Sequence, residues 1–597
     1  MNQSNAAVSN GQTAAIKHGE GPALVVAGPG SGKTYVITKR LEYLINTCHI
    51  DPSNILTITF TNAAAKEMRS RAYSLIGGGV AGVTVGTFHS VFYSILKEAF
   101  SLNASNILRP QDKYILLCDI ARKLDIVEAD MATVCDGISA LISRKKNGLE
   151  SPGIFGSDID EKILSLYSAK LKELRLIDFD DMIIKCRNLL EKDPVWLDKI
   201  RNRFLYIMVD EYQDTNPVQY EALKLIAGNK ANILTVGDDD QSIYGFRGAS
   251  FAVLKRFIDD YPQAEVYELC VNYRCRAAIA DAADKVIELN SGRIEKHHTS
   301  FDQTGDEVDI RRFKDRTEEV KAIKAELDSL HPDDSCLLVR TNELAAYFAD
   351  ELDRSGVPVR LRGRRKCLYD TDIGKDVIAY LRLASGIYER EDLLRVMNKP
   401  MRFLSREALG SENAGIQDII DYYKGTGNAY GKAVCLAEDI QQMGHMSPRA
   451  TIRYLMKVVG YEKYIKNEGR DTEKLYALYQ RSADYSSIRQ WLCSIEEEKA
   501  CKDQKAEICA GDRSALNVMT IHASKGLEFA EVFIADVNDG IIPYHKAASP
   551  EGIEEERRLL YVGMTRAVKK LHLFFIEESM GKPLMPSPFL NAIKKTR

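Results

Sequence analysis

The 597-residue sequence lacks any apolar run close to the roughly 20 residues that a membrane-spanning helix needs, so we expect no membrane partner. Its first residues lack a charged stretch followed by an apolar one, and we therefore expect no signal peptide and a cytoplasmic location. The twelve cysteines include no C-x-x-C pair, and the spacing of Cys493, Cys501 and Cys509 suits neither zinc nor iron–sulfur sites. We expect reduced thiols in and near the hydrophobic cores.

The sequence also lacks a strong excess of either charge. The formal net charge is −4, with 28% charged and 45% hydrophobic residues, as in ordinary globular proteins. This balance does not indicate a nucleic-acid-binding protein, but it does not exclude one, because a local basic groove is sufficient. There are no low-complexity tracts and no short repeats, and the length allows about four structural units of roughly 150 residues each.

Short β-type segments alternate with helical patterns in the first part of the chain, which favours a doubly wound parallel sheet. Residues 97–202 are instead nearly all helical in character. We therefore predict a first α/β core at residues 1–96 and 203–264, interrupted by a helical insertion. Its predicted strands are residues 23–27, 55–60, 83–85, 204–209 and 233–236.

A second α/β unit is predicted at residues 265–369 and 513–597, again interrupted by a mostly helical insertion, at residues 370–512. The predicted architecture is thus two parallel-sheet cores, each with a helical insertion. The predicted strands of the second unit are residues 266–270, 308–313, 336–340, 359–361, 517–521, 531–535 and 571–575.

A phosphate-binding loop is predicted at residues 27–34, which read Ala-Gly-Pro-Gly-Ser-Gly-Lys-Thr, with Ala27 at the first glycine position as the one departure from the strict pattern. The glycines let the backbone wrap tightly, so that N–H groups point at phosphates, and the following helix adds its positive dipole end. Lys33 is predicted to neutralise the β- and γ-phosphates and Thr34 to ligate magnesium. The alternative is a glycine-rich turn without a ligand. The predicted nucleotide-binding residues here are Ala27, Gly28, Pro29, Gly30, Ser31, Gly32, Lys33 and Thr34.

Two adjacent carboxylates, Asp210 and Glu211, follow the predicted strand at residues 204–209, and strand ends are where α/β sheets bind ligands. We predict that Asp210 holds the magnesium ion and that Glu211 orients or deprotonates the attacking water. The alternative is that both carboxylates cap the helix that Pro217 begins. Gln241 follows another strand, where its amide is predicted to contact a γ-phosphate; a polar turn is the alternative.

These segments, in this order, resemble the UvrD/PcrA/Rep family of superfamily 1A helicases from about residue 12 to residue 590. The resemblance implies two RecA-like cores and a site for ATP and Mg²⁺ in the cleft between them. The other segments that carry it are TFTNAAAKEMRSR at residues 59–71, GTFHS at 86–90, LCVNYR at 269–274, VMTIHASKGLEF at 518–529 and EERRLLYVGMTRA at 555–567.

The resemblance assigns roles to residues outside the phosphate-binding loop. Gln12 would read the adenine, Tyr273 would stack on it and Glu528 would contact the ribose. Arg274 and Arg566 would reach the γ-phosphate from the second core, where an arginine is worth about 10³–10⁵ in rate. Catalysis is therefore expected only when the two cores close on the nucleotide.

Single-stranded DNA and single/double-strand junctions are the partners that the resemblance implies, and aromatic stacking with a basic track is the usual way to grip a single strand. Core packing is a serious alternative for Phe60 and Phe88. Two positions depart from the family, which usually has Trp at Phe246 and often has Arg at Tyr35. The predicted DNA-binding residues are Phe60, Phe88, His89, Tyr244, Phe246, Arg247 and His522.

The resemblance implies an ATP-driven 3′→5′ helicase and single-strand translocase. The family often has an Arg-Gly-Ile-Gly turn that contacts duplex DNA, and residues 398–404 lack its glycines. A motor that remodels protein–DNA complexes, or serves a repair or defence complex with little unwinding, is therefore an alternative. A small-molecule kinase is a further alternative.

Residues 568–597 are too few for a nuclease domain, and we expect no C-terminal partner-docking extension. The sequence leaves the pathway and the protein partners open.

Overall fold

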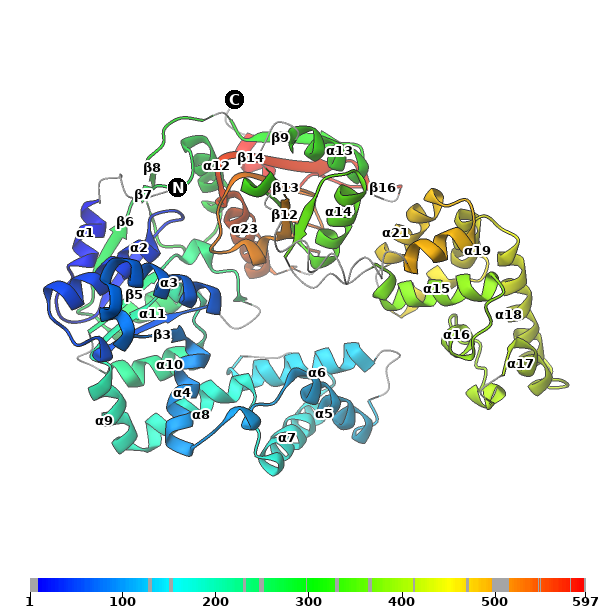
Figure 1. The fold of residues 1–597 in the computed structure, drawn as a ribbon, viewed down its shortest axis with the longest axis horizontal. Helices are drawn as coiled ribbons and strands as arrows, with labels where there is room; N and C mark the ends of the chain where they lie inside the picture. Colours follow the sequence, from blue (N-terminus) through cyan, green and yellow to red (C-terminus); the bar gives the residue numbers. More distant parts are fainter. Residues whose placement is uncertain are drawn as a thin grey trace.

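The computed structural model contains two parallel β-sheets of six strands each, and both sheets carry helices (Figure 1). No helix in the described part of the chain is both long enough and apolar enough to cross a membrane. The structure describes residues 9–126, 131–149, 154–228, 232–245, 252–296, 298–305, 307–327, 332–362, 368–411, 414–468, 472–496, 515–545, 547, 549–579 and 581–594.

The first sheet has the strand order β3-β2-β4-β5-β1-β6, and all neighbouring strands are parallel. Every residue of β1, β2 and β5 is buried, as expected for a parallel sheet that is covered on both faces. The strands are β1 (Ala23–Ala27), β2 (Ile55–Thr59), β3 (Thr84–Thr87), β4 (Tyr206–Val209), β5 (Asn232–Gly237) and β6 (Glu265–Leu269). The helices of this core are α1 (Asn10–Ile16), α2 (Lys33–Glu42), α3 (Asn62–Ile76), α4 (Phe88–Phe100), α10 (Pro217–Ala227) and α11 (Ala252–Asp260).

The second sheet has the order β11-β12-β10-β13-β14-β9, again with parallel neighbours. Its strands are β9 (Asp309–Phe313), β10 (Ser335–Val339), β11 (Val359–Leu361), β12 (Leu516–Thr520), β13 (Phe529–Ile534) and β14 (Ala567–Ile576). Its helices are α12 (Ala277–Ile287), α13 (Arg316–Leu327), α14 (Asn342–Arg354), α23 (Pro550–Met564) and α24 (Leu590–Lys594). Two short parallel strands, β7 (Val271–Asn272) and β8 (Thr299–Ser300), and an antiparallel pair, β15 (Glu578–Ser579) and β16 (Lys582–Pro583), complete it.

One strand lies in a different sheet from the predicted one. The sequence assigns residues 266–270 to the second core, but β6 pairs along β1, with Ala23 opposite Glu265 and Ala27 opposite Leu269. That prediction is wrong, because local alternation reports that a strand exists but not which distant strand it pairs with. The other predicted strands are confirmed, with small shifts at their ends.

The first insertion shares part of its helices with the first core. Helices α5 (Pro110–Lys123), α6 (Met131–Lys146) and α7 (Ser157–Leu174) pack around their own hydrophobic cluster. By contrast, Ile183, Cys186 and Leu190 of α8 (Phe179–Lys192) and Ile200 of α9 (Pro194–Arg203) belong to the cluster that packs on the first sheet. Helix α8 lies against α4 and α10, so it anchors the insertion to the core.

The second insertion has a hydrophobic core of its own around Trp491, and in Figure 1 it lies to the right of α14. Because β11 and β12 are neighbours in the sheet, the chain leaves and re-enters the second core at adjacent strands. Ion pairs join the insertion to α14, among them Arg354–Asp484 at 3.1 Å and Arg481–Asp350 at 3.8 Å. Its helices are α15 (Asp372–Ala384), α16 (Arg390–Val396), α17 (Ile416–Tyr422), α18 (Asn428–Gly444), α19 (Pro448–Lys457), α20 (Tyr461–Asn467) and α21 (Glu473–Arg481).

The cysteines that the structure describes are all free thiols, as predicted. Cys118 and Cys135 face each other across α5 and α6 in the buried part of the first insertion, with their sulfur atoms 3.4 Å apart. Cys493 is exposed, and Cys501 and Cys509 lie outside the described residues.

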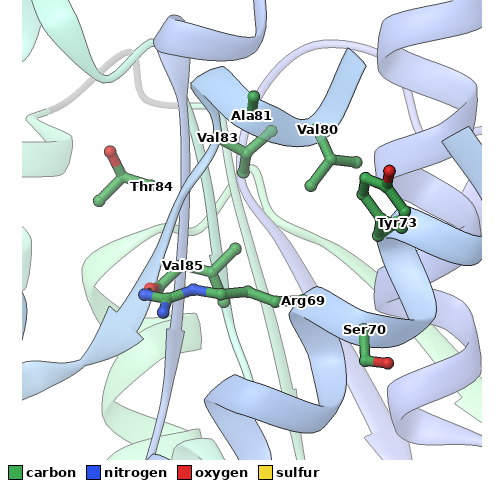
Figure 2. A pocket seen from close by; sticks show the side chains of 8 residues that line it. All are labelled: Arg69, Ser70, Tyr73, Val80, Ala81, Val83, Thr84 and Val85. Atoms are coloured by element: carbon green, nitrogen blue, oxygen red, sulfur yellow. The ribbon is translucent and has the colours of Figure 1, made fainter. Parts of the chain in front are cut away.

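A surface pocket of about 530 Å³ lies at the edge of the first sheet, between β3 and α3 (Figure 2). Arg69 extends from α3 and donates a hydrogen bond to the backbone oxygen of Val85 on this edge strand. Covering a backbone acceptor in this way protects an edge from pairing with another chain. Three strands, β2, β4 and β5, lie between β3 at this pocket and β1 at the phosphate-binding loop, so the pocket and the loop are distinct.

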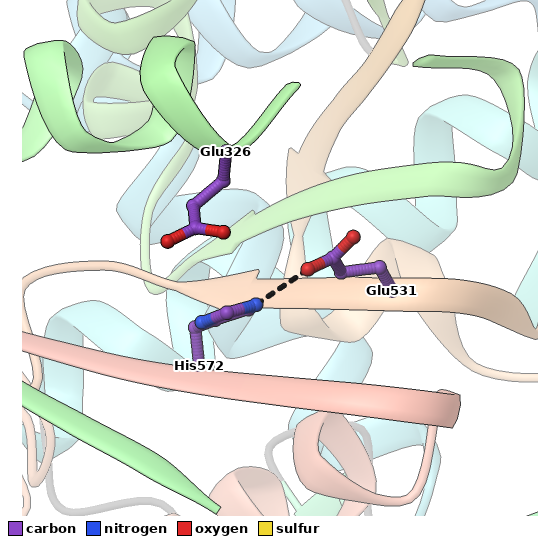
Figure 3. Close-up of side chains that lie close together, drawn as sticks. All are labelled: Glu326, Glu531 and His572. Carbon is purple, nitrogen blue, oxygen red and sulfur yellow. Dashed lines mark hydrogen bonds and ion pairs between the residues drawn. The ribbon is translucent and has the colours of Figure 1, made fainter. Parts of the chain in front are cut away.

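An ionic cluster joins three strands and one helix of the second core (Figure 3). The ring of His572 on β14 lies between two carboxylates, with Nδ1 2.7 Å from Asp309 and Nε2 2.6 Å from Glu531. Arg311 pairs with both Asp309 at 2.8 Å and Glu326 of α13 at 2.7 Å. A charged imidazolium donates to both of its carboxylates, whereas a neutral ring donates to only one.

Replacing His572 by leucine should destabilise the chain, because the buried Glu531 carboxylate loses its partner. Removing one member of a buried ionic pair costs about 3–5 kcal/mol, and chemical denaturation of the full chain measures this loss. The control is Arg312→Ala, since Arg312 pairs with Glu577 at 3.2 Å on an exposed surface, where a pair is worth about 0–1 kcal/mol. Equal losses in the two variants would show that the His572 cluster has no special role in stability.

Candidate nucleotide and nucleic-acid site between the two cores

The loop at residues 27–34 has the backbone of a phosphate cradle. Gly30 and Gly32 adopt φ values of +66° and +86°, a region that favours glycine, and α2 begins directly afterwards at Lys33. Gln12 lies beside the loop, where its side-chain amide donates to the backbone oxygen of Ser31 at 2.9 Å. The structure therefore brings together the loop and the glutamine that the sequence analysis assigned to the same site.

The two predicted carboxylates lie at the end of β4. Glu211 adopts the left-handed region at φ +51° and its backbone N–H donates to Asp210 Oδ1 at 3.0 Å. Residues held in such strained backbone conformations concentrate at functional sites. Burial and the neighbouring Glu211 raise the pKa of Asp210 to about 7. Although burial acts in the opposite direction, Lys525 and Lys33 lower the pKa of Glu211.

Oxygen ligands are the donors that Mg²⁺ prefers, and Thr34 and Asp210 supply a hydroxyl and a carboxylate. The raised pKa of Asp210 reflects a buried negative charge that lies next to another carboxylate. A divalent cation would compensate this charge, so the residues fit the predicted metal.

Asp238, at the end of β5, connects the loop to the carboxylates. Lys33 Nζ lies 3.5 Å from Asp238 Oδ2, and the Gln241 side-chain amide donates to the same oxygen at 2.5 Å. The backbone N–H of Asp238 donates to Gln213 Oε1 at 2.9 Å, and the Gln213 amide donates to Glu211. Gln213 and Gln241 thus join both strand ends into one hydrogen-bonded network.

Arg566 reaches this network from the second core. Its Nη2 lies 3.4 Å from Gln241 Oε1, and its other acceptors are the backbone oxygens of Val562 and Leu527 and the hydroxyl of Thr565. All these acceptors are neutral, and among the described residues none of the ion pairs includes this guanidinium, which is 1% exposed. Burial, with the nearby Arg274, lowers the pKa of Arg566 to about 9. A buried cation whose hydrogen-bond acceptors are all neutral is expected to bind an anion.

Arg274 and Tyr273 lie against the outer side of the loop. The backbone N–H of Tyr273 donates to Gly30 O at 3.0 Å, and a Cβ at Gly30 would lie 2.5 Å from Cβ of Arg274. Arg274 Nε pairs with Glu528 at 2.8 Å, and the Tyr273 ring lies 5.5 Å from Phe301. The predicted adenine, ribose and phosphate contacts from the second core therefore gather beside the loop.

Lys525 is a second cation of the second core that contacts the first core, and it is not among the predicted site residues. It pairs with Asp214 at 2.5 Å, donates to Gln241 O at 2.7 Å and lies 3.8 Å from Glu211. Its ammonium group also lies 5.2 Å from the centre of the Tyr244 ring. Lys525 thus contacts both the carboxylate pair and an aromatic residue predicted to bind DNA.

A buried ionic network ties the end of β5 to the segment before β8. Lys296 pairs with Asp238 and Asp239 at 2.5 Å each and with Asp240 at 2.8 Å, and Arg293 makes two bonds to Asp240. Burial opposes the charge on Lys296, but the three aspartates raise its pKa well above the ordinary range. No sequence signal identifies Lys296 or Arg293, since each is an isolated cation in a loop.

Three of the predicted DNA-binding residues form a line across the two cores. The rings of Phe60 and Tyr244 stack with centroids 5.2 Å apart, and Tyr244 lies 6.4 Å from His522 of the second core. The ring of His89, another of the predicted residues, lies 6.0 Å from the ring of Phe179 on the first insertion.

Phe88 does not belong to the predicted DNA-binding group. Its side chain is 3% exposed and packs against Phe92 in the core of the first sheet. The structure thus shows the core packing given as the alternative for Phe88, at an inward position of the amphipathic helix α4. Phe246 and Arg247 lie outside the described residues.

Comparison with known families agrees with this geometry. The model of the UvrD/REP helicase N-terminal domain matches residues 8–262, and the model of the UvrD-like helicase C-terminal domain matches residues 267–578. The chain belongs to the UvrD/REP helicase family. The predicted architecture of two RecA-like parallel-sheet cores is thereby confirmed.

Curated relatives match almost the whole chain. The ATP-dependent DNA helicase PcrA of Bacillus subtilis (strain 168) is 32% identical over 94% of this chain and 82% of its own length. PcrA of Staphylococcus aureus (strain MRSA252) is 30% identical over 98% of this chain and 86% of its own. The ATP-dependent DNA helicase Rep of Buchnera aphidicola subsp. Baizongia pistaciae is 31% identical over 94% of this chain and 90% of its own.

Replacing Lys296 by methionine removes the cation that contacts Asp238, Asp239 and Asp240. Leaving buried charges uncompensated should lower the free energy of unfolding by about 3–5 kcal/mol, measured by chemical denaturation. The matched control is Lys321→Met on α13, where the side chain is exposed and a change of about 0.5 kcal/mol or less is expected. A Lys296→Met variant as stable as this control would refute the proposed strength of the network.

Proposed function

We propose that this protein is an ATP-dependent DNA helicase and single-strand translocase that moves 3′→5′. The observation that carries the proposal is the buried Arg566 guanidinium, which faces the phosphate-binding side of the first core with only neutral acceptors. The charge of a nucleotide polyphosphate would supply the missing anion. The names of the relatives, all ATP-dependent DNA helicases, support the same activity here.

The first core would bind the phosphates and prepare the water. The backbone of residues 27–34 would cradle the polyphosphate, and Lys33 would exchange its pair with Asp238 for the phosphates. Thr34 and Asp210 would hold Mg²⁺, which supplies charge neutralisation of the phosphates when it is bound. Glu211 would orient the water and accept its proton, with its carboxylate fixed by the Gln213 amide.

The second core would complete the site. Tyr273, together with Gln12 of the first core, would recognise the adenine, and Glu528 would contact the ribose. Arg274 and Arg566 would stabilise the charge that spreads over the γ-phosphate oxygens in the transition state, an effect worth about 10³–10⁵ in rate. Gln241, which already contacts Arg566, would report the presence of the γ-phosphate.

The line of Phe60, Tyr244 and His522 would contact the DNA, with bases stacking along it. Lys525 touches both this line and the carboxylates, so movement of a base against Tyr244 would alter the surroundings of Glu211. This contact provides a direct physical route from DNA binding to hydrolysis. The 3′→5′ direction itself rests on the family resemblance.

A second candidate is a DNA-dependent motor that remodels protein–DNA complexes with little unwinding. The observation that favours it is the turn at residues 398–404, where the family resemblance would place a duplex contact. Arg402 is buried there, with hydrogen bonds to the backbone oxygens of Val396 and Pro400. Phe403, at φ +58° and 77% exposed, replaces the small residue expected at such a backbone position.

DNA-stimulated ATPase and strand-separation assays on 3′-tailed, 5′-tailed and blunt duplexes test the proposal. We expect stimulation by single-stranded DNA and unwinding of the 3′-tailed substrate. Unwinding only from 5′ tails would contradict the direction, and strong stimulation without unwinding would support the second candidate. ATPase activity indifferent to DNA would contradict both.

The variant Glu211→Gln tests the role proposed for Glu211 in the ATP site. It should lower turnover by about 10²–10⁴-fold, the usual contribution of a general base, and leave ATP binding intact. Loss of ATP binding in this variant would contradict the role given to Glu211.

A further inference from the structure

His298 is the side chain of the second core that lies closest to the beginning of the phosphate-binding loop. A Cβ built on Gly28 would lie 2.2 Å from Cε1 of His298 and 2.6 Å from its Nε2. The ring edge thus occupies the space that any side chain at position 28 would need. The backbone φ of Gly28 is not positive, so its conformation would accept other residues. Glycine is required here because the His298 ring leaves no space for a side chain.

The backbone holds this imidazole firmly in place. His298 directly precedes β8, whose Thr299 N–H donates to Cys270 O at 2.9 Å, and Phe301 N–H donates to Asn272 O at 2.8 Å. These bonds pair the segment with β7, the strand that leads into Tyr273 and Arg274. His298 therefore belongs to the same rigid unit as the residues proposed to bind the nucleotide from the second core.

The chemistry of the imidazole is unusual for a structural histidine. Its Nε2 is buried, and no hydrogen-bond partner for it lies among the described residues. The charged groups that face the ring are Asp238 and Asp240 at the end of β5, Lys296 on its own segment and Lys33 on α2. Burial is the main cause that lowers the pKa of His298, so the ring is neutral at pH 7.

We propose that His298 senses nucleotide phosphate through a proton: when phosphates enter the loop, its Nε2 takes up one proton from solvent and the resulting imidazolium supports their binding. The inference rests on the proposed function, that is, on nucleotide binding by residues 27–34. Phosphates bring several negative charges close to the ring, and negative charge favours the protonated form. In the tautomer with the hydrogen on Nδ1, the orphaned Nε2 has a free lone pair that accepts this proton.

This linkage has a defined sign. If bound nucleotide favours protonated His298, then nucleotide affinity rises as the pH falls through the range between the two pKa values of the ring, free and bound. Within that range one proton is taken up, so affinity changes by up to about tenfold per pH unit. If His298 only packed against Gly28, replacing it would change the stability of the fold but would not change the number of protons taken up when nucleotide binds.

Calorimetric titration with MgADP near pH 6.5, in two buffers of different ionisation enthalpy, measures this proton number. We expect the wild-type chain to take up about 0.5–1 proton more than His298→Gln, which places a neutral amide that cannot be protonated in this pH range near the Nε2 position. His298→Leu should show the same loss as His298→Gln. The matched control is His445→Gln, an exposed histidine of the second insertion, which should retain the wild-type proton number.

The outcomes separate this inference from the proposed function. Equal proton numbers in the wild type and both His298 variants, with MgADP still bound, would overturn the role of His298 alone. Failure of the wild type to bind MgADP would overturn nucleotide binding itself. If one His298 variant does not fold, the other decides the question. The inference would also be refuted if the MgADP affinity of the wild type depended on pH no more steeply than that of the folded variant.

Discussion

The pairing of buried charges across the cleft is the interaction on which the functional site depends. Lys525 and Lys296 come from the second core, and their carboxylate partners lie at the ends of β4 and β5 in the first. Separation of the cores would break both sets of ion pairs. The two cores therefore form one site, and the position of each side chain in it is set by both sheets.

Because the same charges surround the proposed nucleotide site, the cleft would couple hydrolysis to movement along DNA. Lys525 contacts Asp214 and lies near both Glu211 and Tyr244, so it spans the distance from the carboxylates to the aromatic line. Arg566 is buried and hydrogen-bonds only neutral acceptors, so its guanidinium is available to a polyphosphate in the closed cleft. Nucleotide binding would thus stabilise closure, and hydrolysis would weaken it.

The parts that the sequence predicts are those with a local signal. The loop at 27–34 and Asp210 and Glu211 each follow a strand directly, so spacing alone locates them. Lys296 carries no such signal, and Lys525 lies in the segment at 518–529 without any indication of its role, because their partners lie roughly 60 and 300 residues away in the chain. The sequence assigned β6 to the second core although it pairs with β1, and it left the burial of Phe88 open, because both features depend on non-local packing.

The measurement that tests the central claim most directly is the ATPase rate of Lys525→Met with and without single-stranded DNA. If Lys525 carries the effect of DNA to Glu211, this variant should lose most of the stimulation by DNA, while DNA binding measured by fluorescence anisotropy persists. Lys569→Met, an exposed position on β14, should retain stimulation. A Lys525→Met enzyme with the stimulation factor of the wild type would contradict the claim that this contact couples the two sites.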